Sequence, residues 1–257
     1  MKRNFLLLVA ALGTAVSAFA WGQKGHDVTA YIAEQHLSEQ VKAKVEAALD
    51  GHSLVYYSNW LDNASNTPEY RYTKTWHYKN VEDGQAYESA PAISTGDVVW
   101  AIKDIVNKLK NGNLSHEDEN IALRMLIHLV GDLHQPLHMG HKVDLGGNKI
   151  KIFSFNRDTN LHSYWDSEIV DFVHKWSYSE WQFQIDRASA EEEAKIVAGD
   201  VDTWAKESIS IVAGIYADTP EGSRVSYNYG AKYAPVVEQQ FLKGGLRLAH
   251  LLNSIYK

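Results

Sequence analysis

Apolar residues recur every three or four positions along most of the chain. In residues 95–110, the clearest segment, the apolar positions are Val98, Val99, Ile102, Ile105, Val106 and Leu109. This spacing places them on one face of a helix, and Asn111 and Gly112 are typical of a helix end. The segment is therefore predicted to be an amphipathic helix with one buried face.

A second long helix is predicted directly after it. Ser115 is a typical N-cap residue, and the acidic residues 117–119 suit the positively polarised first turn of a helix. The apolar pattern continues to Asp132. Pro136 prevents the helix from extending past Gln135, because proline lacks the amide hydrogen and clashes with the preceding turn.

The same periodicity predicts helices in most of the remaining chain. They cover residues 27–36, 38–48, 54–62, 162–174, 191–217 and 234–254, with residues 191–217 forming one helix or two. Residues 146–155 differ, because charged and apolar residues alternate from Lys149 to Phe153, as in a strand or hairpin. Without repeats or linkers, this pattern predicts a single, mainly helical, all-α domain with one small β-hairpin.

Residues 1–20 have the composition of a signal peptide. Lys2 and Arg3 precede an apolar run at residues 5–18, and Ala18-Phe19-Ala20 fits a cleavage site. The run is too short for a membrane span, and no other segment approaches the ~20 apolar residues that a span needs. We expect an exported protein, periplasmic or secreted and with no membrane anchor, whose mature domain of residues 21–257 begins at Trp21.

Net charge and cysteine content restrict the possible functions. The chain carries 25 Lys and Arg against 32 Asp and Glu, and its formal net charge of −7 becomes −9 when Lys2 and Arg3 are removed. Such an acidic chain does not bind nucleic acid through a broad basic surface, although it can engage phosphates through bound cations. The absence of cysteine excludes disulfides and thiolate zinc sites.

The second long helix ends in side chains that bind metals. His128 and Asp132 are four residues apart, so they project from one helix face. The break at Pro136 lets His138 turn back toward them. Neutral imidazole nitrogens and carboxylate oxygens suit zinc. The alternative for this stretch alone is a core helix with solvated histidines at its end.

Other possible ligands lie before and after this helix. His162 and Asp166 form a second pair with a spacing of four, which again puts both on one helix face. His26, Asp62 and His77 lie upstream, His26 five residues after Trp21. Each of these residues taken singly is more often an ordinary surface or hydrogen-bonded group, so only their combination indicates a metal site.

The order of these residues resembles the S1/P1 nucleases, secreted zinc enzymes that degrade single-stranded DNA and RNA. The resemblance is specific from Trp21 to Asp166 and looser through the helical C-terminal third. It implies an almost entirely α-helical fold of the phospholipase C/P1 nuclease type. It also implies an endonuclease with three Zn²⁺ ions per chain, single-stranded DNA and RNA as substrates, and a monomeric state.

The resemblance further implies which residues hold each ion. The ligands of the first zinc would be Asp62, His77, His128 and Asp132. Those of the second would be His138, His162 and Asp166. Those of the third would be His26, Asp132 and the free amino group and carbonyl of Trp21. Asp132 would therefore bridge two ions. His134, which lies inside the motif, is expected to be structural.

The implied reaction is hydrolysis of a phosphodiester bond to 5′-phosphorylated products. A water shared by zinc ions ~3.5–4 Å apart would be acidified toward a pKa of ~7 and oriented for attack. Asp62 would be the catalytic residue that orients or deprotonates this water. A 3′-nucleotidase activity is compatible with the same site.

The resemblance implies three substrate-binding residues. Tyr78 follows His77 where the family places a ring that stacks on a base, and Asn80 lies where the family often has a base-binding Asp. Asn148, in Gly146-Gly147-Asn148, matches a family loop near the metals, and the same three residues also suit a hairpin turn. Ser65 replaces an Arg that contacts phosphate in many members, and Arg71 and Lys74 are the candidates to supply that charge.

Two alternatives remain at this stage. Zinc-dependent phospholipases C share the helical fold and an N-terminal Trp ligand, but they have a longer gap from that Trp to the first His and a Glu as the last ligand. From another class, the protein could be a non-catalytic zinc-binding structural protein. The three-ligand set of the second zinc argues against this, because structural zinc sites usually have four protein ligands.

Overall fold

The computed structural model describes residues 21–257, and the expected signal peptide, residues 1–20, lies outside them. The α-helices of this part of the chain are α1 (Gln23–Gln35), α2 (Glu39–Ala48), α3 (Leu54–Tyr57), α4 (Trp60–Ala64), α5 (Val98–Asn111), α6 (His116–Leu133), α7 (Leu161–Ser163), α8 (Ile169–Val173), α9 (Tyr178–Ile185), α10 (Ala190–Ile196), α11 (Val201–Asp218) and α12 (Tyr227–Ile255). The fold is therefore mainly helical, which confirms the expected class.

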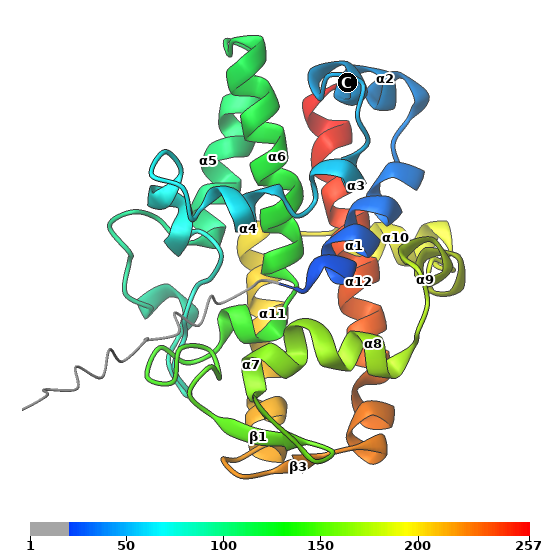
Figure 1. The fold of residues 1–257 in the computed structure, drawn as a ribbon. Coiled ribbons are helices and arrows are strands. Elements are labelled where there is room, and N and C mark those ends of the chain that lie inside the picture. Colours follow the sequence, from blue (N-terminus) through cyan, green and yellow to red (C-terminus); the bar gives the residue numbers. More distant parts are fainter. Residues whose placement is uncertain (1–20) are drawn as a thin grey trace, which may run out of the picture.

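Short helical segments and a small sheet complete the described fold. The 3₁₀ segments are η1 (Arg71–Thr75), η2 (Tyr87–Ser89) and η3 (Pro136–Met139), and η4 (Tyr164–Glu168) is a π-helix. The strands are β1 (Lys151–Ser154), β2 (Arg157–Asn160) and β3 (Arg224–Val225). Figure 1 shows the sheet at one end of the molecule, with α12 running from there toward the opposite end.

The two long predicted helices form as their capping residues indicate. Asp97 accepts a hydrogen bond from the amide of Trp100 at the start of α5, and Gly112 ends this helix in the left-handed conformation. Ser115 caps α6 through the amide of Asp118. In α6, every residue from Met125 to Leu133 is buried. A helix that is covered on all sides lies inside the molecule, so the end of α6 carries its polar side chains into the interior.

The apolar core consists of two clusters that meet along α12. One cluster lies between α2, α5, α6 and the C-terminal half of α12, with Leu123, Leu126 and Leu129 fully buried. The other is rich in aromatic residues and includes Trp21, Trp165, Trp181 and Phe241. Helix α1 packs against α12 and also contacts α6, α9 and α3. This helix therefore holds the N-terminal segment against both clusters.

The predicted hairpin is one part of a three-stranded sheet. β1 pairs antiparallel with β2, while β3 adds to the other edge of β1 in parallel. The two-residue strand β3 is too short to show a sequence pattern. The hairpin turn lies at residues 155–156, where Phe155 has a φ of 55°. Our interpretation of residues 146–148 as the hairpin turn is therefore wrong, because this segment precedes β1.

Several predicted helices are divided or extended. Residues 54–62 form α3 and α4, residues 162–174 contain α7, η4 and α8, and residues 191–217 form α10 and α11, separated near Gly199. Helix α9 was not predicted, although Ser177 and Glu180 form a capping box at its start. Helix α12 begins at Tyr227, well before the predicted residue 234, and contains Pro235. Proline ordinarily ends a helix, but here α12 continues, and Tyr233 and Val237 on either side of Pro235 are buried in the aromatic cluster.

Within residues 21–257, no helix is both long enough and apolar enough to cross a membrane.

Candidate metal centre

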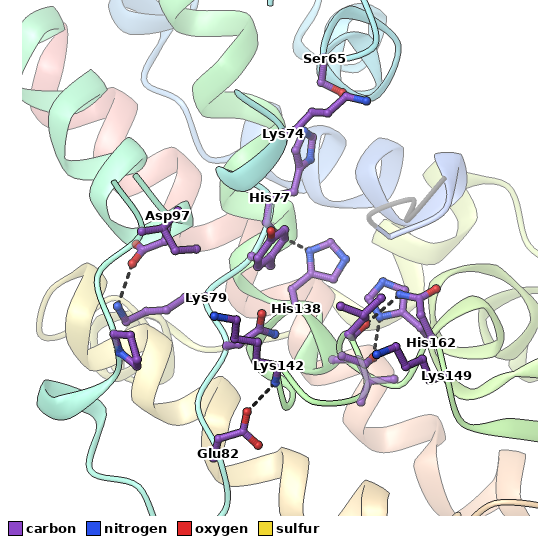
Figure 2. Close-up of a pocket in the computed structure, with 18 of the residues that line it drawn as sticks. Ser65, Lys74, His77, Lys79, Glu82, Asp97, His138, Lys142, Lys149 and His162 are labelled. Carbon is purple, nitrogen blue, oxygen red and sulfur yellow. Dashed lines mark hydrogen bonds and ion pairs between the residues drawn. The ribbon is translucent and has the colours of Figure 1, made fainter. Parts of the chain in front are cut away.

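A pocket of about 1000 Å³ opens beside the end of α6. Figure 2 shows His77, His138 and His162 along its floor, with Ser65 and Lys74 toward one side and Lys149 toward the other. The predicted substrate-binding residues Tyr78, Asn80 and Asn148 also line it. Of the two cations considered as replacements for an Arg at position 65, Lys74 lines this pocket and Arg71 does not.

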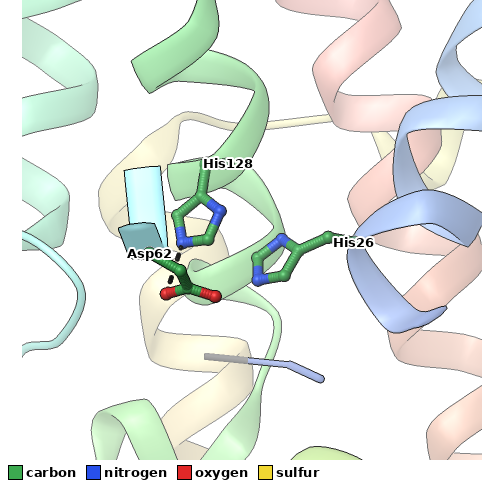
Figure 3. A group of neighbouring side chains, drawn as sticks. All are labelled: His26, Asp62 and His128. Carbon is green, nitrogen blue, oxygen red and sulfur yellow. Dashed lines mark ion pairs between the residues drawn. The ribbon is translucent and has the colours of Figure 1, made fainter. Parts of the chain in front are cut away.

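Polar donor atoms gather in three groups below the pocket. Within each group the nitrogen and oxygen atoms lie within 4.8 Å of one another. The members of the groups are His26, Asp62 and His128; His77, His128 and Asp132; and His138, His162 and Asp166. Figure 3 shows the first group, with His26 from α1, Asp62 from α4 and His128 from α6. Eight predicted ligands therefore converge from seven different segments of the chain.

Asp132 lies at the centre of this arrangement. Its Oδ2 is 2.9 Å from Nδ1 of His77 and 3.3 Å from Nε2 of His128. Its Oδ1 is 3.5 Å from Nε2 of His26 and 3.5 Å from Nδ1 of His138. A fully buried carboxylate with histidines facing both oxygens has the geometry of a group that can be shared between two cations.

Backbone carbonyls orient three of the histidine rings. Nδ1 of His128 lies 2.8 Å from the carbonyl oxygen of Ser58, and Nδ1 of His138 lies 2.6 Å from that of His77. Nδ1 of His162 lies 2.7 Å from the carbonyl oxygen of Gly146. Because a carbonyl only accepts hydrogen bonds, each Nδ1 must carry the proton. The Nε2 atoms are then the ones that can bind a metal, and the ring is fixed in orientation.

Several buried donor atoms in these groups have no hydrogen-bond partner within residues 21–257. They are both ring nitrogens of His26, Nε2 of His77, Nε2 of His138 and Oδ1 of Asp132. A buried polar atom without a partner destabilises the fold by about 1–3 kcal/mol. Four such side chains around one small volume fit a bound cation, whose coordination would satisfy them together.

The electrostatic environment also favours positive charge between these side chains. Burial opposes ionisation of Asp132, but His128 and His138 outweigh it and hold the pKa of this carboxyl well below its usual value. Burial opposes protonation of His128, yet Asp132 and Asp62 raise the pKa of this imidazole well above its usual value. Each group thus stabilises the charged form of the other, with the positive charge located between the two carboxylates.

The third group has a different electrostatic character. Burial raises the pKa of Asp166 well above its usual value, and the hydrogen bond from Gln135 offsets this only in part. The amide nitrogen of Gln135 donates to Oδ1 of Asp166 at 2.5 Å, while its oxygen accepts from the amide of Leu137. A cation bound beside a buried carboxyl would favour its ionised form and oppose this shift. Sequence reasoning did not identify Gln135.

Close backbone approach requires glycine at two points. A Cβ at Gly131 would lie 2.6 Å from Nδ1 of His26. A Cβ at Gly146 would lie 2.5 Å from the carbonyl oxygen of Leu137 and 3.3 Å from Nδ1 of His162, and φ of Gly146 is +65°. The prediction that the 146–148 loop lies close to the donors is therefore confirmed. Gly131 escaped notice because a single glycine inside a helix has no distinctive pattern.

Trp21, the candidate ligand at the expected N-terminus, lies next to the group formed by His138, His162 and Asp166. Trp21 is fully buried, its ring packs on Phe241, and the following amide of Gly22 donates to the carbonyl oxygen of Asp166. His26 groups with Asp62 and His128, although its Nε2 also faces Asp132. The sequence continues before Trp21, so the nitrogen of this residue is an amide in the full chain.

His134 has a separate environment. Its Nδ1 lies 2.7 Å from the carbonyl oxygen of Val130, and its Nε2 accepts a hydrogen bond from the guanidinium of Arg247. Burial and the Arg247 charge hold the pKa of this imidazole well below its usual value. Both nitrogens are therefore occupied by protein groups, in agreement with the expected structural role.

Comparison with known proteins identifies the family of this chain. The model of the S1/P1 Nuclease family matches residues 21–257. Endonuclease 3 of Arabidopsis thaliana is 31% identical over 99% of this chain and 95% of its own length. Nuclease S1 of Aspergillus oryzae is 26% identical over 99% of this chain and 98% of its own. Nuclease P1 of Penicillium citrinum is 27% identical over 92% and 98%.

Proposed function

This chain belongs to the S1/P1 nuclease family and is a hydrolase that acts on nucleic acid, and we propose that it is an exported zinc-dependent endonuclease for single-stranded DNA and RNA. Its products would carry 5′-phosphates. One observation supports this most directly: several buried imidazole nitrogens and one carboxylate oxygen, all without a hydrogen-bond partner within residues 21–257, gather beside an open pocket whose wall includes His77 and His138.

We propose three zinc ions per chain, held as the family resemblance implies. The ligands of the first are Asp62, His77, His128 and Asp132, and those of the second are His138, His162 and Asp166. Those of the third are His26, Asp132 and the processed N-terminus of Trp21. The grouping of His138, His162 and Asp166 within 4.8 Å supports the second set as a unit. The position of Asp132 between four histidines supports its bridging role.

Bound zinc ions would supply polarisation of the phosphate and a water that ionises near neutral pH. The protein then has to orient that water and hold the substrate. Asp62 suits the first task, because its carboxylate lies both among the donor atoms and in the pocket wall, with 13% of the side chain exposed. We therefore assign Asp62 the role of orienting the water and accepting its proton.

The pocket wall suits a single-stranded substrate. Tyr78 is half-buried there and can stack on an unpaired base, an interaction worth about 1–3 kcal/mol. The side-chain nitrogens of Asn80 and Asn148 donate to the carbonyl oxygens of Gly140 and Leu145. Their oxygens remain as acceptors for amino or hydroxyl groups of the substrate, and that of Asn148 is buried without a partner within the described part of the chain.

The experiment uses mature protein that begins at Trp21, verified by N-terminal sequencing. We expect three zinc ions per chain and chelator-sensitive hydrolysis of single-stranded DNA and RNA, with phosphatidylcholine left intact. Hydrolysis of phosphatidylcholine instead would indicate a phospholipase C. Bound zinc without hydrolysis of either polymer would indicate a structural zinc protein.

A matched variant tests the N-terminal ligand. Adding one residue before Trp21 converts its amine to an amide, which cannot bind zinc in the same way. We expect this protein to bind two zinc ions and to lose most of its activity. Full activity with three bound ions would refute the role of Trp21 while leaving the nuclease function intact.

A further inference from the structure

The pocket contains four lysines, and one of them is neutralised by the protein. The ammonium of Lys79 lies 2.8 Å from Oδ2 of Asp97, with both side chains largely buried. This ion pair also fixes the start of α5, because Asp97 is its N-cap. Lys79 is therefore a structural cation whose charge is not available to a ligand.

The other three lysines face the pocket without a carboxylate partner in residues 21–257. They are Lys74, Lys142 and Lys149, and all three are exposed. The ammonium of Lys149 donates to the carbonyl oxygen of Val143, an interaction that leaves its charge uncompensated. Glu82 also lines that wall, but it accepts a hydrogen bond from the backbone amide of Lys142 and forms no ion pair with the side chain of Lys142. Three lysine charges that no ion pair neutralises within residues 21–257 thus line the pocket, beside the carboxylates of Asp62 and Glu82, in a chain whose net charge is −7.

These lysines lie on two sides of the metal-binding groups. Lys74 is on η1, three residues before His77, and Figure 2 shows it beside Ser65. Lys142 and Lys149 are on the loop from η3 to β1, which contacts His162 through Gly146. A ligand held at the donor groups therefore has a cation on either side of it.

We propose that Lys74 on one side, and Lys142 and Lys149 on the other, bind the phosphates that flank the cleaved bond of a polynucleotide. A lysine ammonium binds phosphate as a point charge with three donors, and an exposed side chain can follow a flexible strand. This proposal rests on the proposed nuclease function and extends it. The preferred substrate is a strand with several phosphates, rather than a dinucleotide or a mononucleotide.

The salt dependence of cleavage tests this proposal. Each phosphate contact on a single strand contributes about −0.7 to the slope of log affinity against log salt, so raising salt from 50 to 200 mM weakens binding about 2.6-fold per contact. We expect kcat/KM on a single-stranded oligonucleotide to fall about 18-fold more over this range than kcat/KM on a dinucleoside monophosphate. The dinucleoside monophosphate has no flanking phosphate and serves as the internal reference.

The variants are Lys74→Gln, Lys142→Gln, Lys149→Gln and their combination. Each single variant should reduce the ~18-fold excess of the salt effect on the oligonucleotide about 2.6-fold, and the triple variant should abolish that excess. The control combines Lys110→Gln, Lys175→Gln and Lys257→Gln, which remove the same charge at exposed positions outside the pocket. Thermal unfolding of all variants verifies that the fold is intact.

The two hypotheses fail in different ways. A zinc-loaded wild-type protein that cleaves neither substrate contradicts the nuclease function. A wild-type protein that cleaves both, with a salt effect that the pocket triple variant and the control triple variant change equally, overturns the phosphate-binding role of these lysines alone.

Discussion

Asp132 has contacts that differ in number and kind from those of Asp166. Both carboxyls are buried, but Asp132 faces His26, His77, His128 and His138, whereas Asp166 faces His138, His162 and Gln135. Replacing a carboxylate by the similarly shaped amide removes its charge and one acceptor oxygen. The loss of activity should therefore be larger for Asp132, because more histidines face its charge.

We therefore predict that Asp132→Asn lowers activity roughly tenfold more than Asp166→Asn, since defects in support of a metal site typically cost 10–100-fold. The measurements are kcat/KM on single-stranded DNA and zinc content of both purified variants. Equal losses, or the larger loss in Asp166→Asn, would contradict a bridging role for Asp132.

Gln135 holds the carboxyl of Asp166 and the start of η3 at the same time. Gln135→Leu should therefore weaken zinc binding at the His138 group by about 10–100-fold, because the carboxylate loses the partner that orients it. Zinc affinity is measured by competition with a chelator. The control is Gln240→Leu, which removes an equally buried glutamine bonded to the carbonyl oxygen of His134 and to Ser208. If both variants bind zinc equally well, Gln135 has no orienting role.

At the scale of elements, the two pairs of candidate ligands with a spacing of four residues lie on different kinds of helix. His128 and Asp132 are one turn apart on a regular helix, so their spacing alone predicts that they lie together. His162 and Asp166 have the same spacing, but the chain between them passes from α7 into a π-helix. The prediction of a shared face is correct for both pairs, although the backbone that produces it in the second pair is not a regular α-helix.

The C-terminal end of α1 is connected to α9 and α10 by an ionisable side chain. Nε2 of His36 lies 3.0 Å from the carboxylate of Asp186, and Nδ1 lies 3.8 Å from Glu193. The hydrogen bond to Asp186 raises the pKa of His36 despite partial burial. A raised pKa means that the folded state binds the proton more tightly than the unfolded state. This stabilisation is full below pH 6.5 and is lost as the pH rises through the pKa of the folded state.

We predict that His36→Gln lowers the free energy of unfolding by about 1 kcal/mol at pH 6 and by much less at pH 9. Urea unfolding of both proteins at the two pH values measures this difference. His250→Gln is the control, because His250 is exposed and forms no ion pair within the described residues. If the free energies of unfolding of the wild type and His36→Gln differ by the same amount at both pH values, the charged form of His36 makes no contribution to stability.

At the scale of the whole molecule, the metal groups join elements from both core clusters. Their side chains come from α1, α4, α6, η3, α7, η4 and the segment after η1, and they include atoms without a hydrogen-bond partner in the described part of the chain. The chain also has no cysteine to cross-link these elements. Cation binding should therefore contribute to the stability of the whole fold as well as to catalysis.

We predict that zinc raises the melting temperature of the chelator-treated mature protein. One site filled at a free concentration of 1,000 times its dissociation constant adds about 4 kcal/mol, which corresponds to roughly 8–16 °C for a domain of this size. Differential scanning calorimetry with and without zinc measures the shift, and magnesium at the same concentration is the control. The absence of a shift would show that the donor groups do not bind zinc in the folded protein.

The sequence by itself determined the helical class, most helix positions and the identities of the candidate ligands. These features depend on interactions between residues close in the chain, such as the capping of α6 by Ser115 and the spacing of His128 and Asp132. The same local patterns could not reveal the two-residue strand β3 or the start of α12 at Tyr227. Contacts with distant segments decide both of these features.

The tertiary structure alone decided which candidates meet. His26, Asp62 and His128 come from elements separated by tens of residues, and only the packing of α1 and α4 against α6 brings their side chains together. The tertiary structure also decided which lysines are neutralised. Lys79 pairs with Asp97, whereas Lys74, Lys142 and Lys149 line the pocket without an ion pair in the described residues. Residue type specifies what a side chain can bind, but burial and neighbouring charges determine whether that capacity is already satisfied by the protein itself.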